Sequence, residues 1–343
     1  MTPRTMPVSP VILALETSCD ETAAAVCDGA GAILSSEISS QIAEHAPYGG
    51  VVPEVASRNH MARLRPLIHT ALEKAGITVN DVDCFAATAG PGLASSLLVG
   101  NTTAKALALA CGRPFLPVNH MEGHLLSPFL GEAGGIQPGV ALIVSGGHTM
   151  LLDLRGAGDC HLLGRTRDDA AGEAFDKVGK MLGLPYPGGP EIDRMARTGQ
   201  RDAFDFPRSM KHTADDDFSF SGLKTSMLYT LTDMGDGVAR RLPDLCASFQ
   251  EAIVDVLVSK TLRAARRLGA RSISLSGGVS CNSRLREAFT NACKRARLTL
   301  FMASPVNSTD NAAMIAYAAL HRFQAGGRGS LEDDVNPNLA LGC

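Results

Sequence analysis

The chain lacks the features that mark several common protein classes. None of its nine cysteines forms a CxxC pair or a framework of short spacings, which argues against a disulfide scaffold and favours a reducing compartment. No segment approaches the roughly 18 uninterrupted apolar residues that span a bilayer. The first ten residues hold a single Arg and no apolar run. We therefore expect no signal peptide, transit sequence or membrane anchor, and a cytoplasmic protein.

Two nucleotide-binding motifs are also missing. Without GxxxxGK[ST] there is no P-loop, and without GxGxxG after the first strand a Rossmann cofactor site is disfavoured. The formal net charge of −3 does not indicate a nucleic-acid binder, since phosphate contacts require clustered Lys and Arg. Local basic groups do occur, and solvated helix faces explain them most simply. They are Arg263, Arg266, Arg267, Arg271, Lys294, Arg295 and Arg297.

The length, composition and residue patterns of the chain predict an α/β protein. The length of 343 residues and 45% hydrophobic content allow two domain-sized units. Strands alternate with helices. The strands are expected at 11–16, 23–27, 33 onward, 82–88, 115–118, 141–144, 150–154 and 272–275, and the helices at 54–75, 93–110, 171–182 and 243–268. The segment 186–222 lacks periodicity and is interpreted as an ordered insertion. We expect an N-terminal lobe, 1–130, completed by the helix 309–325, and a C-terminal lobe, 131–308.

Two strands run directly into Ser-Gly-Gly, giving SGGHT at 145–149 and SGGVS at 276–280. Glycine has no Cβ to block an approach, so backbone N–H groups in such turns can contact phosphate. The two matching segments are a weak indication of an internal repeat, and they suggest two sides of one nucleotide site. The polar segment ETSCDET at 16–22 could add hydroxyls and carboxylates near a phosphate or its metal ion.

The segment His120-Met-Glu-Gly-His124 indicates a metal site. Imidazoles four residues apart share one face of a helix and can chelate one ion. Asp310, at the start of a predicted helix, offers a carboxylate as third ligand, although by itself it would be interpreted as a helix N-cap. The pattern is not the HExxH of zinc proteases, because Met121 stands where the general-base Glu is required and Glu122 points off the metal face.

These segments, in their order, resemble the universal tRNA N6-adenosine threonylcarbamoyltransferases, once misnamed O-sialoglycoprotein endopeptidases. The resemblance covers nearly the whole chain. The matching segments are ALETSCDET at 14–22, YGGVVPEVASRNH at 48–60, TAGPGL at 88–93, NHMEGH at 119–124, SGGHT at 145–149, GEAFDKVGKMLGLPYPGGP at 172–190, FSFSGLKT at 218–225, SGGVSCN at 276–282 and STDNAAMIA at 308–316. The family has the two-lobed fold of actin and the sugar kinases.

The resemblance implies a reaction and its site. The threonylcarbamoyl group of threonylcarbamoyl-AMP, a mixed anhydride, passes to N6 of the adenosine that follows the anticodon in tRNAs reading codons that begin with A, and AMP leaves. One divalent metal, iron in most members and zinc as the alternative, is held by His120, His124 and Asp310. The donor or an ATP-like nucleotide is expected at Ile143, Val144, Ser145, Gly146, Gly147, Asp176, Gly189, Asp193 and Asn282.

For three of these nucleotide-site candidates, simpler structural interpretations stay open. Asp176 could pair with Lys177 or Lys180, Asp193 with Arg194 or Arg197, and Asn282 could be an N-cap.

The catalytic base is unassigned, with Glu16, Asp20 and Glu21 as candidates. Kinship to the bacterial family implies an inactive paralogue and a small ATPase as partners, and tRNA as substrate. The alternative functions are an ATP-dependent phosphotransferase of the sugar-kinase fold and a non-catalytic regulatory ATPase; both have less use for an open metal site.

Overall fold

The computed structural model describes residues 9–342, which form two compact units. The first comprises the chain up to Ile136 together with Asp310–Gly342, and the second comprises Gln137–Thr309. The interpretation of the first eight residues as neither signal peptide nor anchor lies outside the described part. Among residues 9–342, no helix is both long and apolar enough to cross a membrane.

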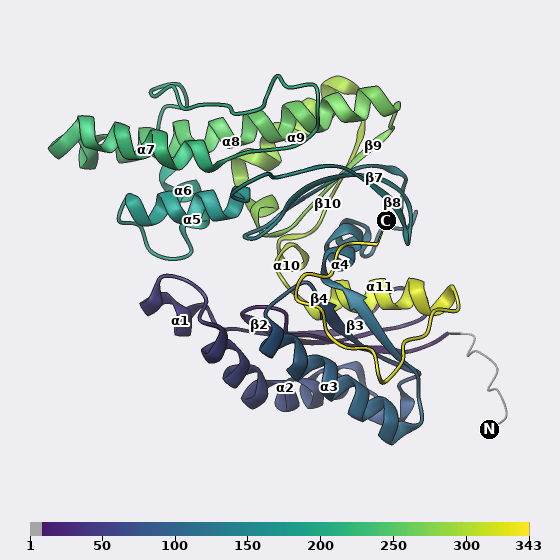
Figure 1. The fold of residues 1–343 in the computed structure, drawn as a ribbon. Helices are drawn as coiled ribbons and strands as arrows, with labels where there is room; N and C mark the ends of the chain where they lie inside the picture. Colours follow the sequence, from purple (N-terminus) through teal and green to yellow (C-terminus); the bar gives the residue numbers. More distant parts are fainter. Residues whose placement is uncertain (1–8, 343) are drawn as a thin grey trace. The chain divides into compact units, whose positions relative to one another are not determined.

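The first unit is built on a five-stranded mixed sheet with helices on both faces (Figure 1). The strand order is β3-β2-β1-β4-β5; β1 is antiparallel to β2 and parallel to β4. Its strands are β1 (Ile12–Glu16), β2 (Glu21–Cys27), β3 (Ile33–Ser40), β4 (Cys84–Gly90) and β5 (Phe115–Asn119). Its helices are α1 (Ile42–His45), α2 (Pro53–Ala75), α3 (Ala94–Cys111), α4 (His120–Leu126) and α11 (Ala312–Gln324).

Alternation along the strands decides which helix covers which face. Leu13 and Leu15 of β1 pack with Leu64 of α2 and Ala104 of α3 in one buried cluster. Small residues of β2 face the other way and pack against the first residues of α11. A strand directs successive side chains to opposite faces, so both faces of this sheet are buried. Helix α11, from the end of the chain, thereby completes the first unit.

The second unit repeats this plan. Its sheet has the order β10-β9-β6-β7-β8, with β6 antiparallel to β7 and parallel to β9. The strands are β6 (Gly139–Val144), β7 (Thr149–Gly156), β8 (Asp159–Arg165), β9 (Ser272–Ser276) and β10 (Thr299–Met302). The helices are α5 (Ala171–Met181), α6 (Gly188–Ala196), α7 (Ser221–Met234), α8 (Val238–Leu268), α9 (Ser283–Ala296) and α10 (Pro305–Ser308). The α/β fold class is thus confirmed.

The internal symmetry differs from the one suggested by the sequence. The repeat relates the two sheets, whereas both Ser-Gly-Gly turns follow neighbouring parallel strands, β6 and β9, of the same sheet. The segment 186–222, expected as an ordered insertion without periodicity, contains a helix in its first part, where α6 forms with Ile192 and Ala196 in the core. Helix α8 begins before the predicted Pro243, since one proline removes only one helical donor.

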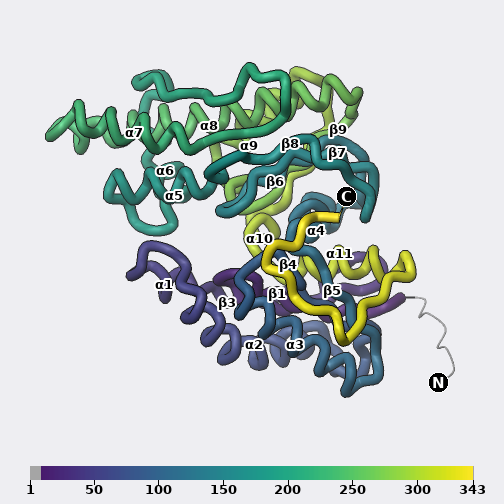
Figure 2. Tube along the Cα trace, viewed as in Figure 1, coloured from purple at the N-terminus to yellow at the C-terminus, as the bar shows by residue number. Residues whose placement is uncertain are grey.

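The C-terminal segment after α11 is extended and lies along β4 and β5 of the first unit (Figure 2). Asn336 donates its backbone N–H to Ala89 O across 2.8 Å, and Gly92 donates to Pro337 O across 3.1 Å. Asn119, the last residue of β5, donates from Nδ2 to Ala340 O across 2.9 Å. The C-terminal segment up to Ala340 is therefore held by hydrogen bonds beside Asn119, the residue that precedes His120.

Candidate metal and nucleotide sites

Helix α4 places the two histidines on one buried face. Asn119 caps this short helix, since its Oδ1 accepts a hydrogen bond from Met121 N across 2.8 Å. The centroids of the His120 and His124 rings lie 4.7 Å apart and their planes cross at 87°. His124 is fully buried and His120 is 7% exposed. The helical spacing predicted from the sequence is therefore present.

Asp310 reaches these rings from a distant part of the chain. Its carboxylate Oδ1 lies 3.1 Å from His124 Nε2 and 3.4 Å from His120 Nε2. Asp310 is not the helix cap that its position suggested. Asn311 caps α11 instead, accepting a hydrogen bond from Met314 N across 2.9 Å. The carboxylate of Asp310 is thus available to the histidines.

Close packing of α11 on α4 brings the three side chains together. A Cβ added to Gly123 would lie 2.9 Å from Ile315 Cδ1 and 3.0 Å from Met314 Cγ. A larger residue at this position would therefore displace the side chains of Met314 and Ile315 on α11. Gly123 lies between the histidines in the sequence, so the close approach occurs where the site forms.

The donor set fits a divalent transition metal. One ligand atom each from His120, His124 and Asp310 lie within 4.8 Å of one another. His124 Nδ1 is buried and has no hydrogen-bond partner within residues 9–342. Two imidazoles and one carboxylate with open positions suit iron and related ions, whereas Mg²⁺ and Ca²⁺ prefer all-oxygen sites.

Glu16 at the end of β1 orients His120, a role that the sequence analysis missed. Its Oε2 lies 3.0 Å from His120 Nδ1 and accepts from Thr88 Oγ1 across 2.5 Å. Its Oε1 accepts from Ser18 N across 2.5 Å. A carboxylate on Nδ1 fixes the tautomer in which Nε2 carries the lone pair for a metal. The signal was weak, because an acidic residue after a strand has many uses.

The charged groups of this site shift one another's pKa. Burial alone would lower the pKa of His120, but the carboxylates of Asp310 and Glu16 outweigh it and raise the pKa well above the ordinary value. Burial would raise the pKa of Asp310, yet His120 and His124 bring it well below its usual range. Burial dominates at His124, whose pKa is lowered. The site therefore favours a protonated His120 imidazole beside the ionised carboxylates of Glu16 and Asp310.

The other acidic residues of the first hairpin are less suited to accept a proton. Burial, followed by the Asp20 and Asp310 carboxylates, raises the pKa of Glu21 to about 9. Glu21 then holds its proton at neutral pH. Glu16 is engaged with His120, Thr88 and Ser18, as described above. No catalytic base is assigned among these residues.

Glu122 is turned away from the candidate metal ligands, as its helical position predicted. Its Oε2 lies 2.5 Å from Arg322 Nη2 on α11. The ion pair joins α4 to α11 on the side that does not carry the histidines. The glutamate that a zinc protease would need is therefore absent from the face where a substrate could meet the metal.

In the second unit, the first Ser-Gly-Gly turn has free space beside its two glycines and is supported by α5. An added Cβ would meet no atom within 4 Å at Gly146 or Gly147. The turn rests on α5, because Gly172 N donates to Ser145 O across 3.2 Å. An added Cβ at Gly172 would lie 2.5 Å from that oxygen. Ile143 and Val144 before the turn are buried strand residues. Backbone groups at Gly146 and Gly147 can accept a close ligand.

The remaining nucleotide candidates connect four helices of the second unit. Asp176 of α5 accepts from Gly188 N across 2.8 Å at the start of α6, next to Gly189. Asp193 of α6 accepts from Ser283 Oγ across 2.7 Å, at the start of α9. These contacts hold the helix ends together.

Asn282 caps α9, as the simpler interpretation proposed: its Oδ1 accepts from Leu285 N across 3.0 Å. Its Nδ2 donates to Gln250 Oε1 of α8 across 2.6 Å. Asp193 also lies 3.9 Å from Arg197. Lys177, by contrast, pairs with Asp169 and Glu173. Each candidate thus has a structural role, and oxygen lone pairs can accept a ligand hydroxyl in addition.

The architecture defines the class of protein first. Two units with the same mixed-sheet plan and helices on the sheets are typical of the actin and sugar-kinase type of ATPase fold. The chain resembles component A of the (R)-2-hydroxyglutaryl-CoA dehydratase from Acidaminococcus fermentans, with a TM-score of 0.55 and 12% identity over 92% of this chain and 99% of that one. At this identity the likeness shows the fold alone.

The family follows from sequence comparison. The family model described as tRNA N6-adenosine threonylcarbamoyltransferase matches residues 32–317. Relatives of that name are 51% identical in Anaeromyxobacter sp. (strain Fw109-5), over 96% of this chain and 99% of the relative, and 49% identical in Geobacter sulfurreducens, over 96% and 97%. The chain belongs to the tRNA N6-adenosine threonylcarbamoyltransferase family and is a transferase. This decides against the regulatory ATPase and the phosphotransferase.

Proposed function

We propose that the chain transfers the threonylcarbamoyl group from threonylcarbamoyl-AMP to N6 of the adenosine 3′-adjacent to the anticodon, in tRNAs that read codons beginning with A, and releases AMP. Membership of the family supports tRNA threonylcarbamoylation. The observation that carries the finer proposal is the convergence of two His Nε2 atoms on the Asp310 carboxylate. A mixed anhydride needs a polarised carbonyl and a held phosphate, and a metal site and an open glycine turn suit these two tasks.

His120, His124 and Asp310 would hold one divalent metal, iron with zinc as the alternative. When bound, the metal would supply Lewis-acid polarisation and orientation of the donor. The tasks of the protein groups are separate. Glu16 would hold His120 with Nε2 toward the ion, and the packing at Gly123 would keep Asp310 within reach of both rings.

The donor's adenylate would be held by the second unit. Backbone N–H groups of Gly146 and Gly147 would approach the phosphate, because nothing occupies the space where a side chain would stand at the two glycines. The N–H of Ser145 closes the turn instead, donating to His148 O across 2.8 Å. The Asp176 and Asp193 carboxylates and the Gly189 backbone would meet the ribose, and Asn282 the adenylate. Short carboxylates suit ribose hydroxyls, as at dinucleotide sites.

The partner proteins expected by kinship are an inactive paralogue and a small ATPase. Exposed apolar side chains on the helices of the first unit support a protein partner there. Met61 of α2 is 72% exposed, and Leu98 and Leu109 of α3 are 47% and 70% exposed. The proposed location is the cytoplasm, where a tRNA substrate would be met.

The reaction is tested by reconstitution. Unmodified tRNA is incubated with this chain, threonylcarbamoyl-AMP and the two partner proteins, omitting each component in turn, and nucleosides are analysed by mass spectrometry. Threonylcarbamoyladenosine that forms only when this chain is present is the expected result. Absence of the product, with phosphoryl transfer from ATP instead, would refute the proposal.

The metal site is tested separately. His120→Ala, His124→Ala and Asp310→Asn should each lose bound metal and modification activity while keeping the folded state, because each removes one ligand. Metal content by elemental analysis and the thermal unfolding midpoint are measured together. Full metal content in all three folded variants would contradict the assignment of the ligands.

A further inference from the structure

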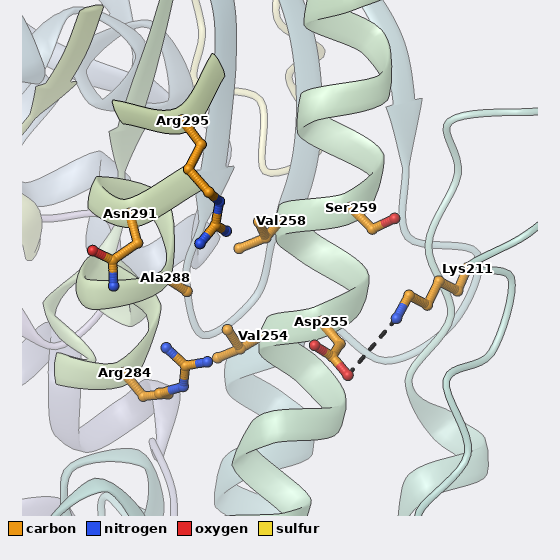
Figure 3. Close-up of a pocket in the computed structure, with 9 residues that line it drawn as sticks. All are labelled: Lys211, Val254, Asp255, Val258, Ser259, Arg284, Ala288, Asn291 and Arg295. Atoms are coloured by element: carbon orange, nitrogen blue, oxygen red, sulfur yellow. Dashed lines mark ion pairs between the residues drawn. The ribbon is translucent and has the colours of Figure 1, made fainter. Parts of the chain in front are cut away.

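A pocket between α8 and α9 of the second unit lies outside the metal and nucleotide residues described above. Figure 3 shows side chains that reach into it from both helices and from the segment between α6 and α7. Its volume is about 270 Å³. The lining residues are Lys211, Val254, Asp255, Val258, Ser259, Arg284, Ala288, Asn291 and Arg295.

One face of α9 forms a wall of this pocket. Arg284, Ala288, Asn291 and Arg295 follow one another at spacings of four, three and four, which places them on a single helix face. The two arginines extend toward the pocket from its opposite ends, with the small Ala288 between them (Figure 3). Val254 and Val258 of α8 provide an apolar surface opposite. The result is a groove with cations at its ends and an apolar middle.

Two of the three lining cations already have acidic partners. Arg284 Nε and Nη2 each lie 2.7 Å from an oxygen of Glu251. Lys211 Nζ lies 3.7 Å from Asp255 Oδ2. Arg295 is exposed and has no ion pair or side-chain hydrogen bond to any residue between 9 and 342. Its guanidinium is therefore the group that a ligand anion would meet.

The nearby acidic groups do not cancel the positive charge. Asp255 is shared by Lys211 and Arg208, which lies 3.0 Å away. Glu287 is shared by Arg284 at 3.1 Å and Arg201 at 3.3 Å. Arg208 also lies 3.6 Å from Asp205, and Arg284 pairs with Glu251, so these four cations are matched by four carboxylates. The excess positive charge of the groove is therefore that of Arg295.

A second unpaired arginine lies beyond the pocket on α8. Arg266 follows Ser259 by seven residues, so it lies on the same face of α8 as Ser259, about 10 Å further along. It has no ion pair within the described chain. Arg263 and Arg267 of the same helix turn instead to Asp216. Of the four arginines noted in this stretch of the sequence, Arg263 and Arg267 thus bind Asp216, whereas Arg266 and Arg271 have no ion pair within residues 9–342.

We propose that this groove binds the phosphate backbone of the tRNA substrate. The inference rests on the proposed function, in which tRNA is the acceptor. Arg295 and Arg266 would each meet one phosphate, and the apolar surface of Val254 and Val258, between Arg284 and Arg295, would accept a ribose or base. Successive cations along two helices suit a polyanion better than a single free phosphate. Because the whole chain has a net charge of −3, RNA affinity has to come from such local sites.

The position of Arg295 on α9 agrees with a role in binding tRNA. The helix begins after Asn282, a predicted adenylate position, and Arg295 lies about 20 Å further along it. An RNA strand that follows α9 from Arg295 toward its N-terminus would thus approach the proposed donor site within one unit. Charged contacts at such a distance position a substrate without taking part in the chemistry.

The test uses charge reversal with a matched control. Arg295→Glu and Arg266→Glu are compared with Arg240→Glu, which makes the same charge change at an exposed position in the first turn of α8. Affinity for an unmodified tRNA transcript is measured between roughly 50 and 200 mM salt. Each groove variant should bind about tenfold more weakly and lower the salt slope by about one. Arg295→Lys should retain most of the affinity, and metal content and AMP binding should stay at wild-type level.

The outcomes separate this inference from the proposed function. Wild-type tRNA affinity and salt slope in both groove variants, while the wild-type chain modifies tRNA, would refute the groove and leave the function standing. Equal weakening by Arg240→Glu would also refute it, since a general charge effect would then suffice. Competition by inorganic phosphate at Arg295 without any change in tRNA binding would show a free-anion site instead. A wild-type chain that neither binds nor modifies tRNA would refute both proposals.

Discussion

The Oε2 atom of Glu16 lies 3.0 Å from His120 Nδ1, although the two residues are 104 positions apart in the chain. Glu16 is fully buried, and Thr88 and Ser18 N also donate to its carboxylate. Burial alone would raise the pKa of Glu16, but His120 outweighs it and the pKa is lowered. The carboxylate is therefore held ionised against the ring that it orients.

The first prediction concerns this contact. Glu16→Gln should weaken metal binding about 10- to 100-fold, because an amide N–H facing Nδ1 would favour the tautomer in which Nε2 carries the proton. Metal affinity is measured by competition with a chelator. Glu21→Gln is the control, as it removes a neighbouring carboxyl that makes no contact with His120. Unchanged affinity in Glu16→Gln would show that the contact does not orient the ligand.

The second prediction concerns the glycine turn after β6. Gly146→Val should keep the fold, since its side chain enters open space, but should weaken AMP binding by blocking the backbone. Gly172→Ala should both weaken AMP binding and destabilise the protein by about 1–3 kcal/mol, because its Cβ meets Ser145 O. Calorimetric titration and urea unfolding separate the two effects. Gly237→Val, also in open space but outside the site, should change neither.

The third prediction concerns acid stability of the second unit. Asp168 accepts hydrogen bonds from Ser219 Oγ across 2.5 Å, Phe220 N across 2.8 Å and Ser221 Oγ across 2.7 Å. Burial would raise the pKa of Asp168, but these bonds outweigh it and lower the pKa below the ordinary 3.8. A lowered folded-state pKa contributes stability above the unfolded value and loses it as the pH falls toward the folded one.

Asp168→Asn should therefore reduce the free energy of unfolding by about 0.5–1 kcal/mol at neutral pH, since solvent screens this exposed carboxylate, and should flatten its decline below pH 3.8. Urea unfolding across this pH range gives both quantities. Asp236→Asn, which changes an exposed carboxylate, serves as control. The same acid dependence in wild type and Asp168→Asn would count against this role.

The fourth prediction concerns Lys260 of α8, which is fully buried. Its Nζ donates to Thr213 Oγ1 and to Asp215 O, each across 3.1 Å. Lys260→Met keeps an unbranched side chain, one atom shorter, but removes these donors, so the loop around Thr213 should become sensitive to proteases and stability should fall by about 1–3 kcal/mol. Limited proteolysis with mass mapping locates the cut. Lys224→Met, at an exposed position, should give the wild-type digestion pattern.

Local patterns predicted most of the elements near the sites. The helical period at 54–75 and the Gly76 stop correspond to α2, and the apolar run before SGGHT corresponds to β6. Helix α6 was missed, because proline and glycine surround its first turn and its apolar residues are few. Its packing on α8 compensates for the weak local pattern. Local sequence also left the cap of α11 undecided between Asp310 and Asn311; Asn311 caps the helix, while Asp310 contacts the histidines.

The sequence by itself determined the i, i+4 pair of His120 and His124, the two Ser-Gly-Gly turns and, through the order of its motifs, the family. These depend on neighbours along the chain, where helix and turn geometry are short-range properties. The grouping of Asp310 with the histidines was predicted through the resemblance to the family. Only the tertiary structure decided that Glu16 lies on His120, and that Arg295 and Arg266 are left unpaired while Arg263 and Arg267 are not. These contacts of Glu16 and of Asp216 join residues far apart in the chain, and the packing of whole helices and sheets brings them together.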